Sequence, residues 1–174
     1  VTLVSGPVHI KPPLFAEIVH VESAADMYNA VMNRMEEYDI IVKAAAVADY
    51  TIENISDEKI KKNGDSLQLE LARTRDILKA AGFKKNNRQV LCGFSMETSN
   101  LVENSKKKLM SKNCDMIVAN NLKDEGAGFG IDTNKITVIT EGFVKEFDIL
   151  SKKKAAEEVL NQALKIYHDK RKNG

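Results

Sequence analysis

Short apolar runs alternate along this chain with segments whose apolar residues recur every three or four positions. The strongest run, at residues 39–48, contains IIVKAAAV and predicts the central strand of a parallel sheet covered on both faces. Apolar runs at residues 90–94 and 116–120 predict two more buried strands, and residues 1–5 predict a short buried one. Residues 67–72 alternate between apolar and polar side chains, which predicts an exposed or edge strand.

Helices are predicted between these strands. Ser23 can cap a first helix, and Thr74 can cap a short second one that Gly82 ends. A third helix would start at residue 98 or 99 and run to about residue 112. A last amphipathic helix over about residues 152–168 would place one apolar stripe against the core, consisting of Ala156, Val159, Leu160, Ala163, Leu164 and Tyr167.

The remaining segments complete the fold prediction. Residues 135–149 form two alternating runs split by Glu141 and Gly142, which predicts a β-hairpin. Residues 8–21 contain two adjacent prolines and are expected to be irregular, and the charged end at 170–174 is expected to be solvated. The order of elements predicts an α/β fold: a Rossmann-like three-layer sandwich with a mainly parallel central sheet and a C-terminal β-hairpin. Ligands of such sheets bind beyond the carboxyl ends of the strands.

Composition excludes several classes of function. The chain has 174 residues, 43% of them hydrophobic, and a formal net charge of +1, which fits one globular domain and gives no argument for binding to nucleic acid or membrane. Neither a spanning apolar run nor a signal peptide is visible. Cys92 and Cys114 lie in apolar stretches without zinc-ligand spacing, so both are expected to be buried thiols of a cytoplasmic protein.

The end of the strongest apolar run carries the first candidate site. Asp49 follows the run directly, and its carboxylate could bind ribose hydroxyls or a base amino group, or simply belong to a turn. The sequence EKIKK at residues 58–62 follows, with Lys59 and Lys61 on one side if the backbone is extended. These lysines could bind a phosphate from a flexible arm, or form a solvated charged loop.

Other candidates lie further along the chain. Lys108 and Lys112 are four residues apart on a predicted helix and could hold an anion between them or form a solvated face. Asp76 is explained by its place in the first turn of a helix, and Phe94 could stack on a ring or pack in the core. The glycine-rich segment 124–132 is not followed by a helix, so we expect a mobile loop near the site instead of a dinucleotide motif.

Several motifs in order resemble the ligase domain of bacterial phosphopantothenoylcysteine synthetase, also called phosphopantothenate–cysteine ligase. In that family the domain is usually the C-terminal half of the bifunctional DNA/pantothenate metabolism flavoprotein. The resemblance covers nearly the whole chain, and the joint order of the motifs is more specific than any one of them. The matching segments are VTLVSGP at 1–7, AAVADY at 45–50, EKIKK at 58–62, RDIL at 75–78, GFSMET at 93–98, the lysine pair and DMIVAN within 108–120, and FGIDTN at 129–134.

This resemblance implies a role in coenzyme A biosynthesis. The carboxylate of 4′-phosphopantothenate would attack the α-phosphate of CTP, giving an acyl-cytidylate and pyrophosphate, and the amine of L-cysteine would then displace CMP. Mg²⁺ would accompany the triphosphate, with no protein ligand named, and FMN would be present only if a decarboxylase domain precedes this one. The family is commonly a homodimer, through either the hairpin at 135–149 or the strand at 67–72 in this chain.

The resemblance also implies roles for individual residues. Lys59 matches a functional lysine on an arm that closes over the intermediate and neutralises its charge. Asn120 and Phe129 match the family pattern without a firm role. The residues that match the nucleotide pocket are Lys43, Ala44 and Ala45 through their backbone, Asp49 and Phe94 beside the cytidine, Arg75, Asp76, Ile77 and Leu78 as a wall, and Lys59, Lys108 and Lys112 as cationic contacts.

Two departures from the family pattern affect this interpretation. The family's first strand, glycine-rich loop and helix, with a catalytic asparagine, precede the position that matches Val1, so residues 1–174 are expected to form a single CTP-binding ligase domain without them. The alternative is a catalytically incomplete fragment that binds nucleotide or dimerises. Secondly, Arg75 stands where the family usually has a proline that would fix the backbone.

Overall fold

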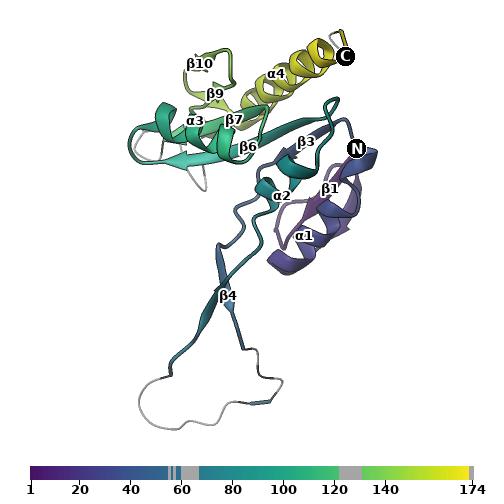
Figure 1. The fold of residues 1–174 in the computed structure, drawn as a ribbon, viewed down its shortest axis with the longest axis vertical. Coiled ribbons are helices and arrows are strands. Elements are labelled where there is room, and N and C mark those ends of the chain that lie inside the picture. Colours follow the sequence, from purple (N-terminus) through teal and green to yellow (C-terminus); the bar gives the residue numbers. More distant parts are fainter. Residues whose placement is uncertain (55, 57, 60–66, 122–130, 173–174) are drawn as a thin grey trace. The chain divides into compact units, whose positions relative to one another are not determined.

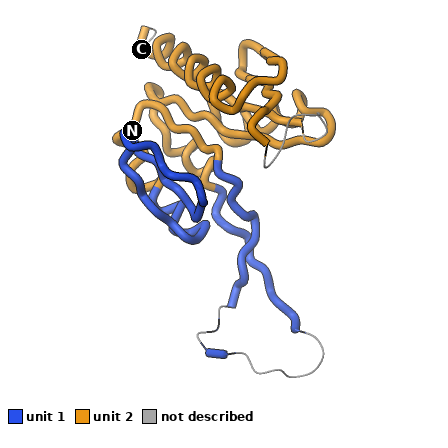
Figure 2. The backbone as a smooth tube through the Cα atoms, turned by 180° about the vertical axis from the view of Figure 1, so that it is seen from behind, with its two compact units in different colours: residues 1–30, 45–76 blue, residues 31–44, 77–174 orange. Residues whose placement is uncertain are grey.

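The computed structural model has a mixed α/β fold and divides into two compact units, coloured separately in Figure 2. Unit 1 comprises residues 1–30 and 45–76, and unit 2 comprises residues 31–44 and 77–174. The chain therefore crosses between the units at 30–31, 44–45 and 76–77. The residues that the structure describes are 1–54, 56, 58–59, 67–121 and 131–172.

Unit 2 contains a five-stranded sheet in the order β10-β9-β7-β6-β3 (Figure 1). Strands β3, β6 and β7 are parallel, whereas β9 runs antiparallel to β7 and pairs with β10 in the predicted hairpin. The strands are β3 (Ile40–Lys43), β6 (Val90–Glu97), β7 (Met116–Asn121), β9 (Thr137–Ile139) and β10 (Val144–Glu146), with a small pair of β8 (Thr133–Asn134) and β11 (Leu150–Ser151). The helices are the 3₁₀ turn η1 (Met35–Glu37), α2 (Ile77–Lys84), α3 (Leu101–Ser111) and α4 (Lys152–Lys172).

The two buried strands of this sheet have a hydrophobic core on each face. Because side chains alternate along a strand, Cys92 and Val118 face the core with α4, whereas Leu91 and Ile117 face the core with α2 and α3. This arrangement confirms the three layers, the mainly parallel sheet and the buried strands predicted at 90–94 and 116–120.

Both cysteines are buried in these cores, as predicted. Cys92 lies in the core that packs on α4, and Cys114 lies in the core between the sheet, α2 and α3. Burial raises the pKa of the Cys92 thiol, and the nearby Cys114 and Asp115 raise it further. The thiol of Cys92 is therefore a packing group in this fold.

The strand predicted at residues 39–48 is shorter than expected and is not central. It is β3, which ends at Lys43 and pairs with β6 at the edge of the described sheet. The alanine-rich continuation forms no strand because the chain passes from unit 2 to unit 1 between Ala44 and Ala45. Alanine also has a weak preference for strands, so the strand predicted from the apolar run was longer than β3.

The last helix buries a stripe that overlaps the predicted one only in part: Val159 and Ala163 are buried and Tyr167 packs against the core, as predicted. Its buried residues are Ala155, Val159, Gln162 and Ala163, so the inward face is rotated relative to the prediction. Leu160 and Leu164 are 51% and 43% exposed, and Ala156 is exposed as well. The sheet contacts a narrow row of small side chains, which lets α4 pack closely and leaves the two leucines at its margin.

Asp115, directly before β7, joins four elements of unit 2. Its Oδ1 and Oδ2 each accept a hydrogen bond from Lys85 Nζ at 2.9 Å, and Oδ1 lies 2.6 Å from Lys170 Nζ. Its Oδ2 also accepts from the backbone N–H of Leu91 at 2.8 Å. The side chains of Asp115 and Lys85 are 12% and 8% exposed. A buried carboxylate thus has two cations and a backbone donor as partners.

The basic end of the chain is held to unit 2, and the prediction of a solvated end was wrong for Lys170, which is partly buried. Arg171 and Lys172 are exposed, and residues 173–174 lie outside the described residues. Helix α4 continues to Lys172, beyond the predicted boundary. Lys170 Nζ reaches Asp115 and also donates to the Gln89 carbonyl at 2.9 Å. Arg171 pairs with Asp39 at 3.0 Å. The charges at 170–171 therefore anchor the last helical turn.

Unit 1 contains two small sheets and most of α1 (Ala24–Met32). Strands β1 (Thr2–Ser5) and β2 (Glu17–His20) pair in parallel, so the prediction that residues 8–21 are wholly irregular was wrong. The prediction of a buried first strand was also wrong, because the β1 residues are partly buried or exposed. Strands β4 (Tyr50–Ile52) and β5 (Leu71–Arg73) form an antiparallel ribbon, which confirms an exposed strand near 67–72 (Figure 1).

Helix α1 begins with the predicted serine cap. Ser23 Oγ accepts from the backbone N–H of Asp26 at 3.1 Å, and the Asp26 carboxylate accepts from the Ser23 backbone at 3.0 Å. This reciprocal pair is a capping box, with aspartate in place of the usual glutamate. The hydrogen bonds from the Ser23 side chain and backbone lower the pKa of Asp26.

Gly82 does not end α2, as the sequence suggested, but lies inside the helix. A Cβ atom at this position would lie 1.8 Å from the carbonyl oxygen of Lys112. The Gly82 carbonyl accepts from Asn113 Nδ2 at 2.6 Å. Glycine is therefore required because α2 touches the backbone that follows α3.

We expect Gly82→Ala to destabilise the chain by about 1–3 kcal/mol, although alanine favours helices by about 1 kcal/mol over glycine. The added methyl group must displace the Lys112 carbonyl. Urea unfolding followed by circular dichroism measures the change. Gly142→Ala is the matched control, because a Cβ there meets nothing within 4 Å. Equal effects of the two substitutions would contradict the close contact.

Candidate functional site

A polar cluster lies at the carboxyl end of β6, on the face covered by α3. It consists of Ser95, Glu97, Asn104 and Lys108 and is called the Glu97 cluster here. Ser95 Oγ donates to Glu97 Oε1 at 2.6 Å, and Asn104 Nδ2 donates to Glu97 Oε2 at 3.2 Å. Lys108 Nζ donates to Ser95 Oγ at 2.9 Å and lies 3.8 Å from Glu97 Oε1. The cluster thus contains one cation and one anion.

Local structure explains why these four side chains meet. Residues 91, 93, 95 and 97 alternate onto one face of β6, and the first of them is buried against α2 and α3. Asn104 and Lys108 are one helical turn apart on α3. Helical side chains lean toward the N-terminus of their helix, and that end of α3 follows the carboxyl end of β6. A lysine can therefore reach back to the strand end.

Only one lysine of the predicted pair, Lys108 and Lys112, belongs to this cluster. Lys108 belongs to it, whereas Lys112 is the residue that caps α3. The Lys112 carbonyl lies against Gly82, so its backbone is fixed by the packing of α2. The side chain of Lys108 is 29% exposed.

The other predicted site residues of unit 2 differ in how far they are buried. Ile77 and Leu78 are 3% and 4% exposed, so their side chains belong to the interior. Phe94 packs against the core beneath α4 and is partly buried, the alternative that the sequence left open. Lys43 pairs in register with Gly93, next to Phe94, and Ala44 is exposed just after β3.

Unit 1 carries Ala45, Asp49 and Asp76, which are all exposed. The Asp49 carbonyl accepts from the Thr74 backbone at 3.0 Å, and Thr74 Oγ1 donates to the Ala48 carbonyl at 2.6 Å. The predicted role of Thr74 as a helix cap was wrong, because its hydroxyl joins the two segments that lead into the β4–β5 ribbon. The Asp49 side chain lies at the base of that ribbon.

Arg75 is held by α1 within unit 1. Its guanidinium lies 3.8 Å from the centre of the Tyr28 ring and donates to Asn29 Oδ1 at 3.1 Å. A proline would restrict the backbone at this position through its ring, whereas Arg75 tethers it through a side chain. Where the family usually has a proline, this chain therefore holds the backbone through the contacts of the Arg75 side chain with α1.

Lys59 is exposed and lies in the segment that joins β4 to β5. Just before it, the Ser56 hydroxyl donates to the Glu58 carbonyl at 2.9 Å and accepts from the Glu58 backbone at 3.2 Å. Lys61 and Phe129 lie outside the described residues, as does most of the glycine-rich segment 124–132.

Sequence reasoning assigned no role to Ser95, Glu97 or Asn104. The available signal was the two polar residues that alternate at the end of an otherwise apolar buried strand. Two more polar atoms are buried, one on α3 and one on β7. Ser105 Oγ and Asn120 Oδ1 have no hydrogen-bond partner among the described residues. The carboxyl ends of β6 and β7 are thus richer in polar groups than the sequence suggested.

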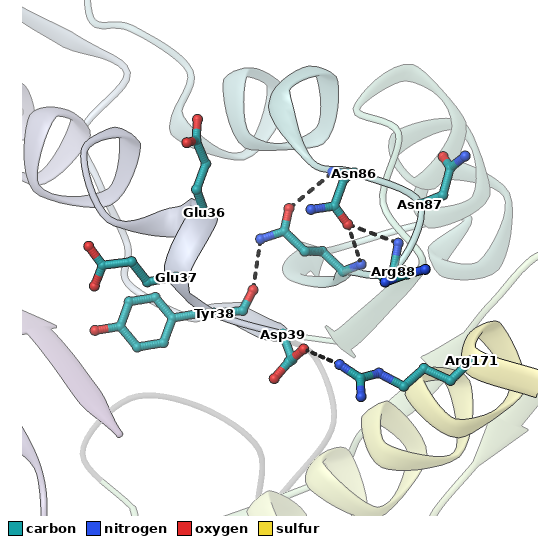
Figure 3. Close-up of a pocket in the computed structure, with 9 residues that line it drawn as sticks. Glu36, Glu37, Tyr38, Asp39, Asn86, Asn87, Arg88 and Arg171 are labelled. Carbon is teal, nitrogen blue, oxygen red and sulfur yellow. Dashed lines mark hydrogen bonds and ion pairs between the residues drawn. The ribbon is translucent and has the colours of Figure 1, made fainter. Parts of the chain in front are cut away.

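A cavity of about 400 Å³ is lined by residues that mostly precede β3 and β6, as drawn in Figure 3. The buried Gln89 amide crosses it, donating to the carbonyls of Met35 at 2.5 Å and Tyr38 at 2.7 Å and accepting from the Asn86 backbone at 3.0 Å. The amide is fully used by the protein, and ligands of parallel sheets bind at the opposite strand ends, so the cavity is not a candidate site. Its lining is Glu36, Glu37, Tyr38, Asp39, Asn86, Asn87, Arg88, Gln89 and Arg171.

Across 1–54, 67–121 and 131–172 and the isolated described positions, no three His, Cys, Asp or Glu side chains gather into a metal-binding group. No described helix is long and apolar enough to span a bilayer.

Comparisons with known proteins agree with this fold. The chain is 46% identical over 164 residues to the Coenzyme A biosynthesis bifunctional protein CoaBC of Bacillus subtilis (strain 168), covering 93% of this chain and 40% of that protein. A crystal structure of the C-terminal domain of a CoaBC protein superposes with a TM-score of 0.80 at 42% identity, covering 97% of this chain and 77% of the other.

A more distant structure shares the fold alone. A Cab2 variant in complex with phosphopantothenate-cysteine superposes with a TM-score of 0.67 at 13% identity, covering 90% of this chain and 55% of the other. This chain spans less than half the length of the curated bifunctional relative. Residues 1–167 match the DNA/pantothenate metabolism flavoprotein C-terminal domain, and the chain therefore belongs to that family.

Proposed function

We propose that this chain is a phosphopantothenate–cysteine ligase domain that uses CTP in coenzyme A biosynthesis. The observation that carries the proposal is the family match over residues 1–167, joined to 46% identity with a bifunctional CoaBC protein. The polar groups at the carboxyl ends of β6 and β7 support it, because nucleotides bind at this end of parallel sheets.

The proposed reaction has two steps. A carboxylate oxygen of 4′-phosphopantothenate attacks the α-phosphorus of CTP, and pyrophosphate leaves. The amine of L-cysteine then attacks the acyl carbon of the acyl-cytidylate, CMP leaves, and the nitrogen loses a proton as the amide forms. Both steps bring anions together, so cationic side chains are the groups that the protein must supply.

The residues of this chain fall into roles within the proposal. Lys108 would contact the triphosphate, because its partly exposed ammonium lies at the carboxyl end of β6. Asp49 would accept hydrogen bonds from the cytidine, and Lys59 would neutralise charge on the reacting groups. Ile77 and Leu78 would contribute backbone groups, because their side chains are buried. Lys43, Ala44, Ala45, Arg75, Asp76, Phe94 and Lys112 complete the proposed nucleotide pocket.

Mg²⁺ would arrive with the nucleotide as part of the substrate. Mg²⁺ commonly binds through phosphate oxygens and water with few protein ligands. The ion would reduce the charge repulsion between the triphosphate and the attacking carboxylate.

We expect Mg-CTP to bind more tightly than Mg-ATP in isothermal titration calorimetry, and Asp49→Ala to weaken CTP binding by about tenfold or more. Hydrogen bonds to a charged group contribute about 1.5–3 kcal/mol, which corresponds to this loss. Asp148→Ala is the control, because Asp148 is an exposed aspartate before β11 and outside the proposed pocket. Equal affinities for CTP and ATP, or unchanged binding by the Asp49 variant, would contradict the assigned pocket.

We expect Lys59→Ala to lower the rate of pyrophosphate release by about 100-fold in the presence of 4′-phosphopantothenate, CTP and L-cysteine. Removal of one preorganised group that stabilises developing charge typically costs this much. A coupled pyrophosphate assay measures the rate, and Lys153→Ala, an exposed lysine at the start of α4, is the control. A Lys59 variant with wild-type turnover would remove this residue from the mechanism.

We infer a homodimer that forms through the β4–β5 ribbon. Leu67, Leu69 and Leu71, in β5 and the segment just before it, are all exposed, which leaves several apolar side chains next to the ribbon. The other candidate strand, β10, is exposed as well but carries Val144 next to two charged residues. Exposed apolar side chains next to an exposed strand favour the ribbon as the interface.

Leu71→Lys should shift the chain from dimer to monomer in size-exclusion chromatography with light scattering, because the interface would bury an unpaired charge. Glu70→Lys, at the neighbouring alternate position, adds a similar cation on the other side of the segment and should leave the dimer intact. A dimer that survives Leu71→Lys but dissociates with Val144→Lys would assign the interface to the hairpin instead.

A further inference from the structure

Three side chains contact the Glu97 carboxylate, two through hydrogen bonds and one through an ion pair. Ser95 Oγ and Asn104 Nδ2 each donate to one of its oxygens, and Lys108 Nζ lies 3.8 Å from Oε1. An ionised carboxylate accepts at both oxygens, whereas a glutamine amide accepts at one and donates at the other. Asn104 Nδ2 also donates to the Ser99 carbonyl at 3.1 Å, so it cannot reverse its amide without losing that bond. Both oxygens of residue 97 therefore act as acceptors, which fits a carboxylate better than an amide at this position.

Ser95 links this carboxylate to Lys108. Its hydroxyl oxygen accepts from Lys108 Nζ at 2.9 Å while its own proton goes to Glu97 at 2.6 Å. Ser95 is 3% exposed and cannot itself meet a ligand from solvent, whereas the Lys108 side chain is partly exposed. The Lys108 ammonium is thus held by one hydrogen bond to a buried hydroxyl and by an ion pair with Glu97, while its side chain stays partly exposed.

We propose that Glu97 is a positioning residue that holds the Lys108 ammonium in place, through Ser95, for the triphosphate of the nucleotide. This inference rests on the proposed function, because it takes Lys108 as a phosphate contact. A lysine that is already ordered loses little side-chain freedom on binding. Release of this restraint should weaken nucleotide binding by about three- to tenfold.

A purely electrostatic role for Glu97 predicts the opposite sign. A negative charge close to a triphosphate repels it, so its removal alone would tighten binding. The neutral substitution Ser95→Ala separates the two effects, because it removes the link between Glu97 and Lys108 without a change of charge. Positioning predicts weaker binding for both Ser95→Ala and Glu97→Gln.

The test is calorimetric titration of the chain and its variants with Mg-CTP. We expect Kd to rise about three- to tenfold for Ser95→Ala and Glu97→Gln, and to recover in part for Glu97→Asp, which keeps the charge. In a Lys108→Met background, neither substitution should raise Kd further. Glu103→Gln is the matched control, because Glu103 pairs with Lys107 at 2.8 Å on the exposed surface of the same helix.

A second measurement follows the lysine without nucleotide. In NMR spectra of lysine side-chain ammonium groups, we expect slow proton exchange at Lys108 in the ligand-free chain, and loss of this signal in Ser95→Ala and Glu97→Gln. Tighter binding by Glu97→Gln with no effect of Ser95→Ala would overturn the inference, as would an undiminished effect in the Lys108→Met background. If the parent chain does not bind Mg-CTP, the proposed function fails and the inference with it. The NMR signal then reports whether the contact between the side chains exists.

Discussion

The packing of unit 2 depends most on the contacts that the largely buried carboxylate of Asp115 makes with Lys85, Lys170 and the backbone of Leu91. Asp115 lies directly before β7, binds the backbone of β6, and pairs with one lysine after α2 and another near the end of α4. Removing one partner of a buried ion pair typically costs about 3–5 kcal/mol, because the remaining charge is left uncompensated. One side chain thus connects both helical layers to the sheet between them.

This connection lies at the amino ends of the parallel strands, and the polar groups of the candidate site lie at their carboxyl ends. Between the two ends, strands β6 and β7 are apolar on both faces and nearly inaccessible to solvent. Close packing of this kind makes the middle of the sheet rigid, since protein interiors are as dense as organic crystals. The end of β6 can therefore hold a hydrogen-bonded cluster in a defined geometry, while stability comes mainly from the middle and the other end of the sheet.

The sequence predicted the layers and the buried strands because two-sided burial leaves a continuous apolar run, as at residues 90–94. It failed where the decisive partner is remote in the chain. Lys170 was expected in solvent because nothing near it in sequence indicates Asp115, and the role of Gly82 depends on the carbonyl of Lys112. The inward face of α4 was misjudged in part because the sheet accepts small side chains at positions where leucine would otherwise be expected.

The candidate site was predicted unevenly for the same reason. Lys108 was found through its basic surroundings and the family resemblance, and the structure adds the contacts that give it a defined position. Glu97 and Ser95 were missed because their importance lies in a network across β6 and α3, which no local spacing reveals. Arg75 was noticed as a departure from the family pattern, but its stacking on Tyr28 depends on a helix more than 40 residues earlier in the chain.

The burial of Cys92 has a consequence for a protein proposed to handle free cysteine. Thiol–disulfide exchange requires an accessible thiolate, and burial both covers this sulfur and disfavours its ionised form. Cys114 is buried as well. The fold therefore keeps both thiols out of mixed disulfides with free cystine, so that a thiol-rich pool would leave the two cysteines of this chain unmodified.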